Sequence, residues 1–296
     1  MKKTQILKEK MNSGKTVVAI GAHDAFTARL VEKVGFDAVY IGSYSTEATM
    51  LGKPDLALMS KTDRLLIARN VAKVVNIPVI VDAEEGYGNA ISVMDTVRDF
   101  EAAGVTGIHL DDEDIPSKCP FIPGIPRNQL ISIDEMCGKI EAAVDARTDP
   151  DFHIMARSDV IGTVPREKYY ENNLMEEVVK RCNAYARAGA DSIMIMALTE
   201  DEVKYFAEHI KAPLSGIFAP AEPLAIDVFQ QSGYQMALGT ILSLYSMARG
   251  VRNALERLKE TGDWNSLGDL IVDDQEFFDI LGLEQYQPCY ATYRIP

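Results

Sequence analysis

The stretch Ile80-Val81-Asp82-Ala83-Glu84-Glu85-Gly86-Tyr87-Gly88-Asn89 decides how this chain is expected to fold. The apolar run that leads into it, 78–81, is typical of a buried parallel strand, and it ends in three acidic residues and a glycine turn. In a barrel of alternating strands and helices, active sites are built where the strands end. Carboxylate oxygens at one point suit a hard cation such as Mg²⁺. The alternative is a solvated acidic turn before a helix. The residues at the ends of the other strands distinguish this turn from a metal site.

Apolar strands alternate with helical patterns outward from this stretch in both directions. We expect strands over 16–20, 38–41, 78–81, 107–110, 152–156, 192–196, 213–218 and 236–238, and helices over 24–34, 61–75, 91–103 and 133–147. Residues 42–45 are expected to form a flexible loop, and the chain after residue 259 to be less regular. Eight strand-then-helix units without a linker predict an α/β fold. The prediction is a (β/α)₈ TIM barrel in which 1–296 form a single domain and 240–296 its C-terminal helical segment. A doubly wound open sheet competes, but no glycine-rich phosphate fingerprint follows the first strand.

Composition excludes several classes of protein. The net charge of −14 over 296 residues argues against nucleic-acid binding, which needs a basic surface. No apolar run approaches the roughly 20 residues that span a bilayer, and the polar start predicts a cytoplasmic protein without a membrane segment. The four cysteines lack disulfide or metal-finger spacing, which favours reduced thiols. Three of them are expected to be packing residues: Cys137, Cys182 and Cys289.

Polar side chains follow four neighbouring predicted strands, so they are expected to converge at the barrel mouth. Grouped carboxylates repel one another unless they share a cation, which favours a divalent metal. An arginine fork binds a substrate carboxylate with two hydrogen bonds. A metal and an arginine together predict a site for a small dianionic oxo-acid, with the metal on an enolate-like oxygen. The residues are Ser43, Ser45, Asp55, Asp82, Glu84, Asp111, Glu113 and Arg157.

Three segments together resemble the isocitrate lyase and phosphoenolpyruvate mutase superfamily, in the right order between about Gly21 and Gly250. They are Met50-Leu51-Gly52-Lys53-Pro54-Asp55, the run 82–89, and Ala156-Arg157-Ser158-Asp159. The resemblance implies a (β/α)₈ barrel that binds Mg²⁺, or Mn²⁺ in its place, and catalyses reactions that proceed through the enolate of a 2-oxo acid. It also implies a homotetramer in which the helical stretch after Gly239 is exchanged between subunits.

The resemblance assigns roles to individual residues. It implies that Asp82 binds the metal directly and that three further carboxylates, Asp55, Glu84 and Asp111, hold the waters of the metal. Arg157 would bind the substrate carboxylate, together with the backbone and side chains of Gly42, Ser43 and Tyr44. His109 is expected beside the acidic cluster, where it would orient a ligand, and is counted with the substrate-binding group. Two residues depart from the usual pattern of the superfamily. Glu84 stands for an aspartate and is one methylene longer, and Asp111 stands for a glutamate and is one methylene shorter.

The segment 115–129 contains four prolines and is expected to be a lid over the site. Lyases of the superfamily carry Lys-Lys/Arg-Cys-Gly-His in this loop, and the chain resembles them in part, with Ser117-Lys118-Cys119-Pro120-Phe121. Cys119 would protonate the enolate carbon, and Lys118 would support its thiolate. A small apolar thiol under the lid is the alternative interpretation. The asparagine-serine pair of the mutases does not stand here.

Apolar residues replace two polar residues of the superfamily's lyases. Met196 stands for a glutamate after the sixth strand, and Ile217 or Phe218 for an asparagine after the seventh. An apolar wall favours an alkyl substituent over a third carboxylate. The leading hypothesis is a Mg²⁺-dependent carbon-carbon lyase of the 2-methylisocitrate or dimethylmalate type that releases a 2-oxo acid through a metal-bound enolate. The alternatives are a phosphoenolpyruvate or carboxyphosphonoenolpyruvate mutase, a phosphonopyruvate hydrolase, an oxaloacetate decarboxylase or hydrolase, and a binding protein without turnover.

Overall fold

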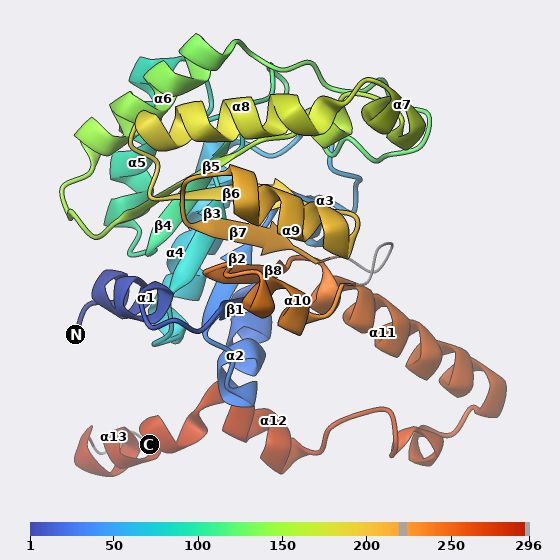
Figure 1. The fold of residues 1–296 in the computed structure, drawn as a ribbon. Coiled ribbons are helices and arrows are strands. Elements are labelled where there is room, and N and C mark those ends of the chain that lie inside the picture. Colours follow the sequence, from blue (N-terminus) through green and yellow to red (C-terminus); the bar gives the residue numbers. More distant parts are fainter. Residues whose placement is uncertain (219–223, 294–296) are drawn as a thin grey trace.

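Eight parallel strands form a closed barrel in the computed structural model, which describes residues 1–218 and 224–293 (Figure 1). Neighbouring strands pair in chain order, and β8 returns to β1, where Met236 lies opposite Val17. The expected α/β fold, a (β/α)₈ TIM barrel, is therefore confirmed. The strands are β1 Val17–Gly21, β2 Ala38–Ile41, β3 Val79–Asp82, β4 Gly107–Asp111, β5 His153–Arg157, β6 Ser192–Met196, β7 Leu214–Ile217 and β8 Met236–Gly239.

Helices cover the outside of the barrel, and capping residues fix where several of them begin. Side-chain oxygens accept hydrogen bonds from the first-turn N–H groups of five helices, at Asp24, Ser60, Asn89, Ser132 and Thr199. The helices are α1 Lys3–Met11, α2 Ala25–Val34, α3 Ser43–Leu51, α4 Lys61–Val74, α5 Ala90–Ala102, α6 Ile133–Ala146, α7 Arg166–Glu171, α8 Leu174–Arg187, α9 Glu200–His209, α10 Ile226–Gln231 and α11 Leu242–Thr261.

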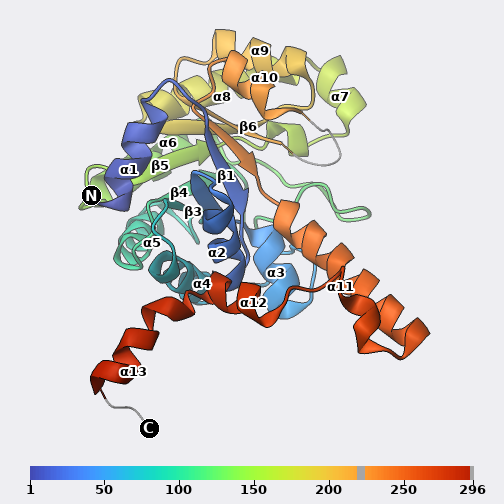
Figure 2. The same ribbon diagram turned by 90° about the horizontal axis from the view of Figure 1, so that it is seen from below.

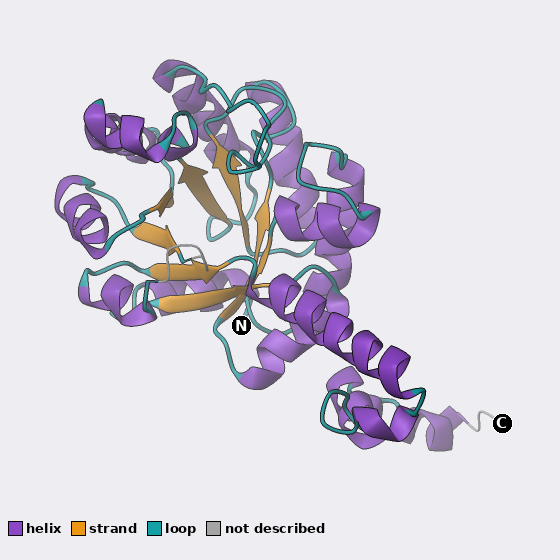
Figure 3. Ribbon diagram, turned by 90° about the vertical axis from the view of Figure 1, so that its right-hand side faces the viewer, coloured by secondary structure: helices purple, strands orange, loops and turns teal. Residues whose placement is uncertain are grey.

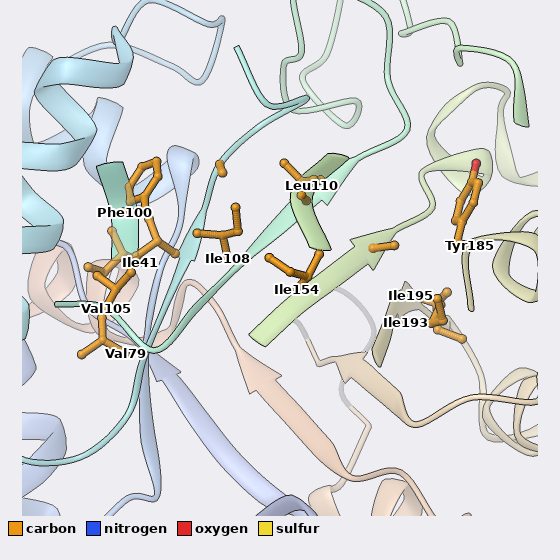
Figure 4. Packing of buried hydrophobic residues seen from close by; sticks show 14 of the residues in the cluster. Ile41, Val79, Phe100, Val105, Ile108, Leu110, Ile154, Tyr185, Ile193 and Ile195 are labelled. Atoms are coloured by element: carbon orange, nitrogen blue, oxygen red, sulfur yellow. The ribbon is translucent and has the colours of Figure 1, made fainter. Parts of the chain in front are cut away.

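Alternate residues of most strands belong to two different apolar clusters. Val79 and Val81 of β3 pack outward against the helices, whereas Ile80 packs inside the barrel. The same alternation separates the outward Ile154 of β5 from the inward Met155. Figure 4 shows residues of the outward cluster, among them Ile108 and Leu110 of β4 and Phe100 of α5. Because side chains alternate with a period of two, the inward set also decides which residues reach the barrel mouth.

One expectation about local structure is wrong, and the C-terminal end is less regular, as expected. Residues 42–45 do not form a flexible loop, because Gly42 is the N-cap of α3 and Ser43 is its first residue. The chain after residue 259 contains further short helices: η2 Trp264–Leu267, α12 Asp274–Leu281, η3 Leu283–Gln285 and α13 Gln287–Tyr293. Cys182 is buried and Cys137 partly buried, but Cys289 is exposed on α13, so its expected packing role is not met in this chain.

The C-terminal segment leaves the barrel. Helix α11 extends away from the strands in all three ribbon views (Figures 1, 2 and 3), and Leu244 is the one residue of this helix that is buried. The chain then returns, so that α12 lies against α2 with Phe277 beside Phe26 at 5.7 Å between ring centroids. Within the described ranges, no helix is both long and apolar enough to cross a membrane.

Candidate metal and substrate site

Inward-facing side chains from neighbouring strands meet at the carboxyl ends of β3, β4 and β5. Asp82 lies two residues after the inward Ile80, and Arg157 lies two residues after the inward Met155. The period of two therefore turns both of them toward the barrel interior. Together with Asp111 at the end of β4 they line one cavity, with a volume of about 610 Å³. The structure thus brings together the strand-end residues that the sequence singles out.

Asp82, His109 and Asp111 form a buried cluster at the floor of this cavity. One ligand atom from each of them lies within 4.8 Å of the others. His109 Nδ1 is 2.9 Å from Asp111 Oδ1, and its Nε2 is 2.8 Å from the hydroxyl of Tyr40. Burial lowers the pKa of His109 to about 4, so its imidazole is neutral at physiological pH.

The structure places His109 beside the acidic cluster, as expected, and its contact with the substrate stays a prediction. His109 is fully buried, and both of its ring nitrogens already have partners in Asp111 and Tyr40. A histidine in this position holds a neighbouring carboxylate in a fixed orientation. In this arrangement His109 contacts Asp111 from the buried side of the cluster.

The first turn of α3 links two carboxylates. The backbone N–H of Ser43 donates to Asp82 Oδ2 at 3.0 Å, and the hydroxyl of Ser43 donates to Asp55 Oδ2 at 2.9 Å. Gly42 leaves room for this turn, because a Cβ there would lie 2.7 Å from the ring of Tyr40. Both Gly42 and Ser43 line the cavity, as does Tyr44. The positive end of the helix thus faces the place where an anionic ligand would bind.

Asp55 is held in place by a buried residue that the sequence analysis did not single out. The carboxylate of Glu47 on α3 accepts hydrogen bonds from three backbone N–H groups in the loop after Asp55. The donors are Leu56 at 3.0 Å, Leu58 at 2.7 Å and Met59 at 3.1 Å. Glu47 is fully buried. This carboxylate therefore fixes the loop that carries Asp55 into the site.

Glu84 is paired with a second buried residue that was not singled out. Arg64 Nη2 on α4 donates to Glu84 Oε1 at 2.7 Å, and Arg64 Nη1 donates to the hydroxyl of Thr46 at 2.6 Å. The arginine side chain has no exposed surface. A signal for it exists in the sequence, because Arg64 shares the helical face of the buried Ile67 and Val71. A charge on an apolar face implies a buried partner.

The carboxylates of the site carry more negative charge than the described side chains neutralise. Burial, together with the charge of Asp82, raises the pKa of Asp55 to about 6. Burial also raises the pKa of Asp111, against the opposing effect of Arg157. Asp55 Oδ1 is buried and has no hydrogen-bond partner within the described ranges. Oxygen donors with uncompensated charge fit a metal cation, and Asp82, Asp111, Asp55 and Glu84 are the carboxylates that could hold one.

Arg157 lies beside these carboxylates at the end of β5. Its Nε and Nη2 donate to Asp159 Oδ1 at 3.1 and 2.7 Å, and its Nη1 lies 3.8 Å from Asp111 Oδ2. Asp159 thus holds the guanidinium in one orientation. The Nη1 edge remains on the side of the acidic cluster, where it can reach a substrate carboxylate.

The opposite side of the cavity is apolar. This wall is formed by Met194 and Met196, the inward residues of β6, and by Ile217 at the end of β7. Leu198 continues it after β6. Their positions follow from the same alternation that turns Ile193 and Ile195 outward into the other cluster. The site therefore has a polar half on β2 to β5 and an apolar half on β6 and β7.

Residues 115–129, called the lid below, bring Cys119 to the cavity. Cys119 is partly buried, and its backbone N–H donates to the carbonyl oxygen of Asp55 at 3.4 Å. Burial raises the pKa of its thiol to about 11. Lys118 Nζ donates to Asn128 Oδ1 at 2.5 Å, and its expected support of a thiolate stays a prediction. Cys119 is therefore a protonated thiol at the mouth of the site.

Known proteins resemble this chain over most of its length. The sequence profile of the family described as phosphoenolpyruvate phosphomutase matches residues 7–258. The 2,3-dimethylmalate lyase of Eubacterium barkeri is 37% identical over 295 residues, which cover 97% of this chain and 98% of that protein.

Solved structures agree with the sequence comparisons. A phosphoenolpyruvate phosphomutase from Streptomyces platensis subsp. rosaceus superposes with a TM-score of 0.90 at 30% identity and covers 99% of each chain. A phosphonopyruvate hydrolase, in complex with oxalate and Mg²⁺, superposes with a TM-score of 0.87 at 28% identity and covers 100% of each chain. This chain is therefore an enzyme of the phosphoenolpyruvate mutase and isocitrate lyase superfamily, and it belongs to the phosphoenolpyruvate phosphomutase family within it.

Proposed function

We propose that the protein is a Mg²⁺-dependent carbon-carbon lyase that cleaves a 2-hydroxy diacid with alkyl substituents, of the dimethylmalate type, into a 2-oxo acid and a second carboxylic acid. The observation that carries the proposal is the apolar wall of Met194, Met196 and Ile217 facing the carboxylates across the cavity. Such a wall accepts methyl groups at little cost, whereas a third carboxylate would be left without partners there. The relative named 2,3-dimethylmalate lyase supports this choice.

The proposed reaction breaks the bond between C2 and C3 of the substrate. The C2 hydroxyl loses its proton and becomes the 2-oxo group, and C3 takes up a proton in place of the broken bond. Mg²⁺, or Mn²⁺, would be held by Asp82, Asp111, Asp55 and Glu84 and would supply positive charge for the oxygen atoms of the substrate. The similar phosphonopyruvate hydrolase, which was solved in complex with oxalate and Mg²⁺, supports this choice of metal.

The residues of this chain would bind and orient the substrate around that point. Arg157 Nη1 would bind the carboxylate on C1, together with the N–H groups at the start of α3, at Gly42, Ser43 and Tyr44. The remaining alkyl groups would lie on the wall formed by Met194 and Met196. This arrangement would hold C3 on the lid side of the cavity.

Cys119 would be the acid that protonates C3. Its thiol lies at the cavity and is protonated at neutral pH, because burial raises its pKa to about 11. An acid in this position needs a proton at the operating pH and access to the carbon. Lys118 would contribute by holding the lid rather than by stabilising a thiolate, since its ammonium group donates to Asn128.

A substrate panel tests the proposal. Purified protein with Mg²⁺ would be incubated with 2-alkylmalates, isocitrate, methylisocitrate, oxaloacetate and phosphonopyruvate, and 2-oxo acids would be followed by mass spectrometry. We expect a 2-oxo acid from an alkylmalate, and loss of its release in the Cys119→Ser variant. Cys137→Ser is the matched control, since Cys137 lies on α6 outside the cavity lining. Faster release from an unsubstituted tricarboxylate would contradict the apolar-wall argument.

A phosphorus-transferring reaction on the same site is the second candidate, a phosphoenolpyruvate mutase or a phosphonopyruvate hydrolase. The superposition on a phosphoenolpyruvate phosphomutase with a TM-score of 0.90 favours it. The polar half of the cavity would serve either reaction, because both substrates present a carboxylate beside an oxygen atom. New phosphorus-31 resonances from phosphonopyruvate, without cleavage of any alkylmalate, would decide for this candidate.

We also propose that the protein is a cytoplasmic homotetramer that exchanges α11 between subunits. Along α11 only Leu244 is buried, and several apolar side chains are 41–62% exposed, among them Met247, Val251 and Leu255. Apolar surface of this kind on a helix that leaves the barrel favours burial against another copy. Its four cysteines are free, which fits a reducing compartment. Light scattering after gel filtration should give four times the chain mass.

A further inference from the structure

One buried amide connects the two ends of the lid. Asn128, near the C-terminal end, is 6% exposed. Its Nδ2 donates to the carbonyl oxygen of Lys118 at 2.6 Å, and its Oδ1 accepts from Lys118 Nζ at 2.5 Å. The same Nδ2 also donates to Glu113 Oε2. Asn128 therefore holds the residue directly before Cys119 from both its backbone and its side chain.

Glu113 attaches this arrangement to the barrel. It follows β4 by two residues and is 2% exposed. Its Oε2 also accepts from the hydroxyl of Ser117 at 2.9 Å and from the backbone N–H of Lys118 at 3.3 Å. Glu113 further forms a backbone bridge with Leu130, just after the lid. Both ends of the lid are thus joined at the carboxyl end of β4.

The middle of the lid rests on the segment after β5. Pro120 lies so close to Gly162 of η1 (Val160–Gly162) that a Cβ on this glycine would be 2.6 Å from the Cβ of Pro120. Arg127 Nη1 donates to the carbonyl oxygen of Gly162 at 3.0 Å. Cys119 lies between this contact and the joined ends, so it is positioned from both sides.

We propose that Asn128 is a positioning residue, which keeps Cys119 over the cavity by tying the backbone of Lys118 to Glu113. The role assigned to Cys119 rests on the proposed function, whereas the closure of the lid by Asn128 does not. Without the amide, the carbonyl oxygen and Nζ of Lys118 lose their partner, and its backbone is held to Glu113 only by the N–H bond of 3.3 Å, so the lid opens more often. The opening exposes the thiol of Cys119 and removes the acid from its place over the substrate.

Alkylation of the thiols tests the closure without any substrate. Intact protein would be treated with iodoacetamide, and the modification of Cys119 would be measured by peptide mass spectrometry relative to the exposed Cys289. For Asn128→Ala we expect this ratio to rise about tenfold, which corresponds to about 1.4 kcal/mol for opening the lid. Ser117→Ala removes one hydrogen bond to Glu113 and should raise the alkylation ratio less than Asn128→Ala does. Gln129→Ala, at an exposed neighbour, should leave it unchanged.

Turnover and thermal unfolding complete the test. With an alkylmalate substrate, Asn128→Ala should lower kcat by about tenfold and change KM less, since the lid carries the acid rather than the carboxylate site. A fall in unfolding temperature with an unchanged alkylation ratio in both Asn128→Ala and Ser117→Ala would overturn the proposal and leave Asn128 a purely structural residue. Absence of turnover by the wild type would refute the lyase, while the alkylation ratios would still decide whether Asn128 closes the lid.

Discussion

Glu47 offers the sharpest test of how the site is supported, because it is buried outside the cavity lining and still fixes the loop that carries Asp55. In Glu47→Gln, the amide oxygen can keep the bonds to Leu58 and Met59, but its NH₂ group would face the N–H of Leu56. Hydrogen bonds to a charged acceptor contribute about 1.5–3 kcal/mol each. Loss of one such bond should therefore cost about 2 kcal/mol of unfolding free energy, or about 4–8 °C in Tm for a chain of this size.

The same substitution should weaken metal binding. The loop that carries Asp55 would lose its anchor, and removal of a group that orients a ligand typically lowers metal affinity by about 10- to 100-fold. Titration calorimetry with Mg²⁺ and paramagnetic resonance with Mn²⁺ would measure the affinity, and scanning calorimetry the Tm. Glu176→Gln makes the same chemical change at an exposed position of α8 and is the control. If both variants bind metal and melt alike, Glu47 does not support the site.

Three further predictions concern other parts of the cavity. Arg64→Met should cost about 3–5 kcal/mol in chemical denaturation, because it leaves Glu84 buried without a partner, and a second change of Glu84 to glutamine should recover part of the loss. Met196→Glu should lower kcat/KM for a dimethylmalate by about tenfold or more relative to malate, measured with both substrates in competition. The rate of Cys119 alkylation should keep rising up to about pH 11, since burial raises the pKa of the thiol; a plateau near neutral pH would show a thiolate instead.

The strands and the residues at their ends could be predicted from sequence. Each predicted strand agrees with the structure within one residue at either end, because a strand buried on both faces leaves an uninterrupted apolar run. Asp82, Asp111 and Arg157 come directly at the ends of such runs, and the closed barrel then forces them together. For these residues, the place at the end of an apolar run was enough to predict their position at the mouth of the barrel.

The residues that support the site could not be predicted in this way. Glu47, Arg64 and Asn128 act through contacts with groups 9 to 20 residues away, and nothing in a sequence fixes which buried polar groups will face each other. The start of α3 was missed for a related reason. Gly42-Ser43-Tyr44-Ser45 has the composition of a loop, and the helix begins there because the N–H of Ser43 finds Asp82.

The division of the cavity into a polar half and an apolar half has a consequence for how such enzymes diversify. Asp82 at the end of β3 is tied to α3, and Glu84 just after β3 is tied to α4, by buried hydrogen bonds, so a change there disturbs several partners at once. The side chains of Met194, Met196 and Ile217 form no such hydrogen bonds, so each of them can be replaced without breaking a polar contact. Evolution can therefore replace the substrate while it keeps the metal chemistry, and laboratory selection for new diacids should accumulate its substitutions on β6 and β7.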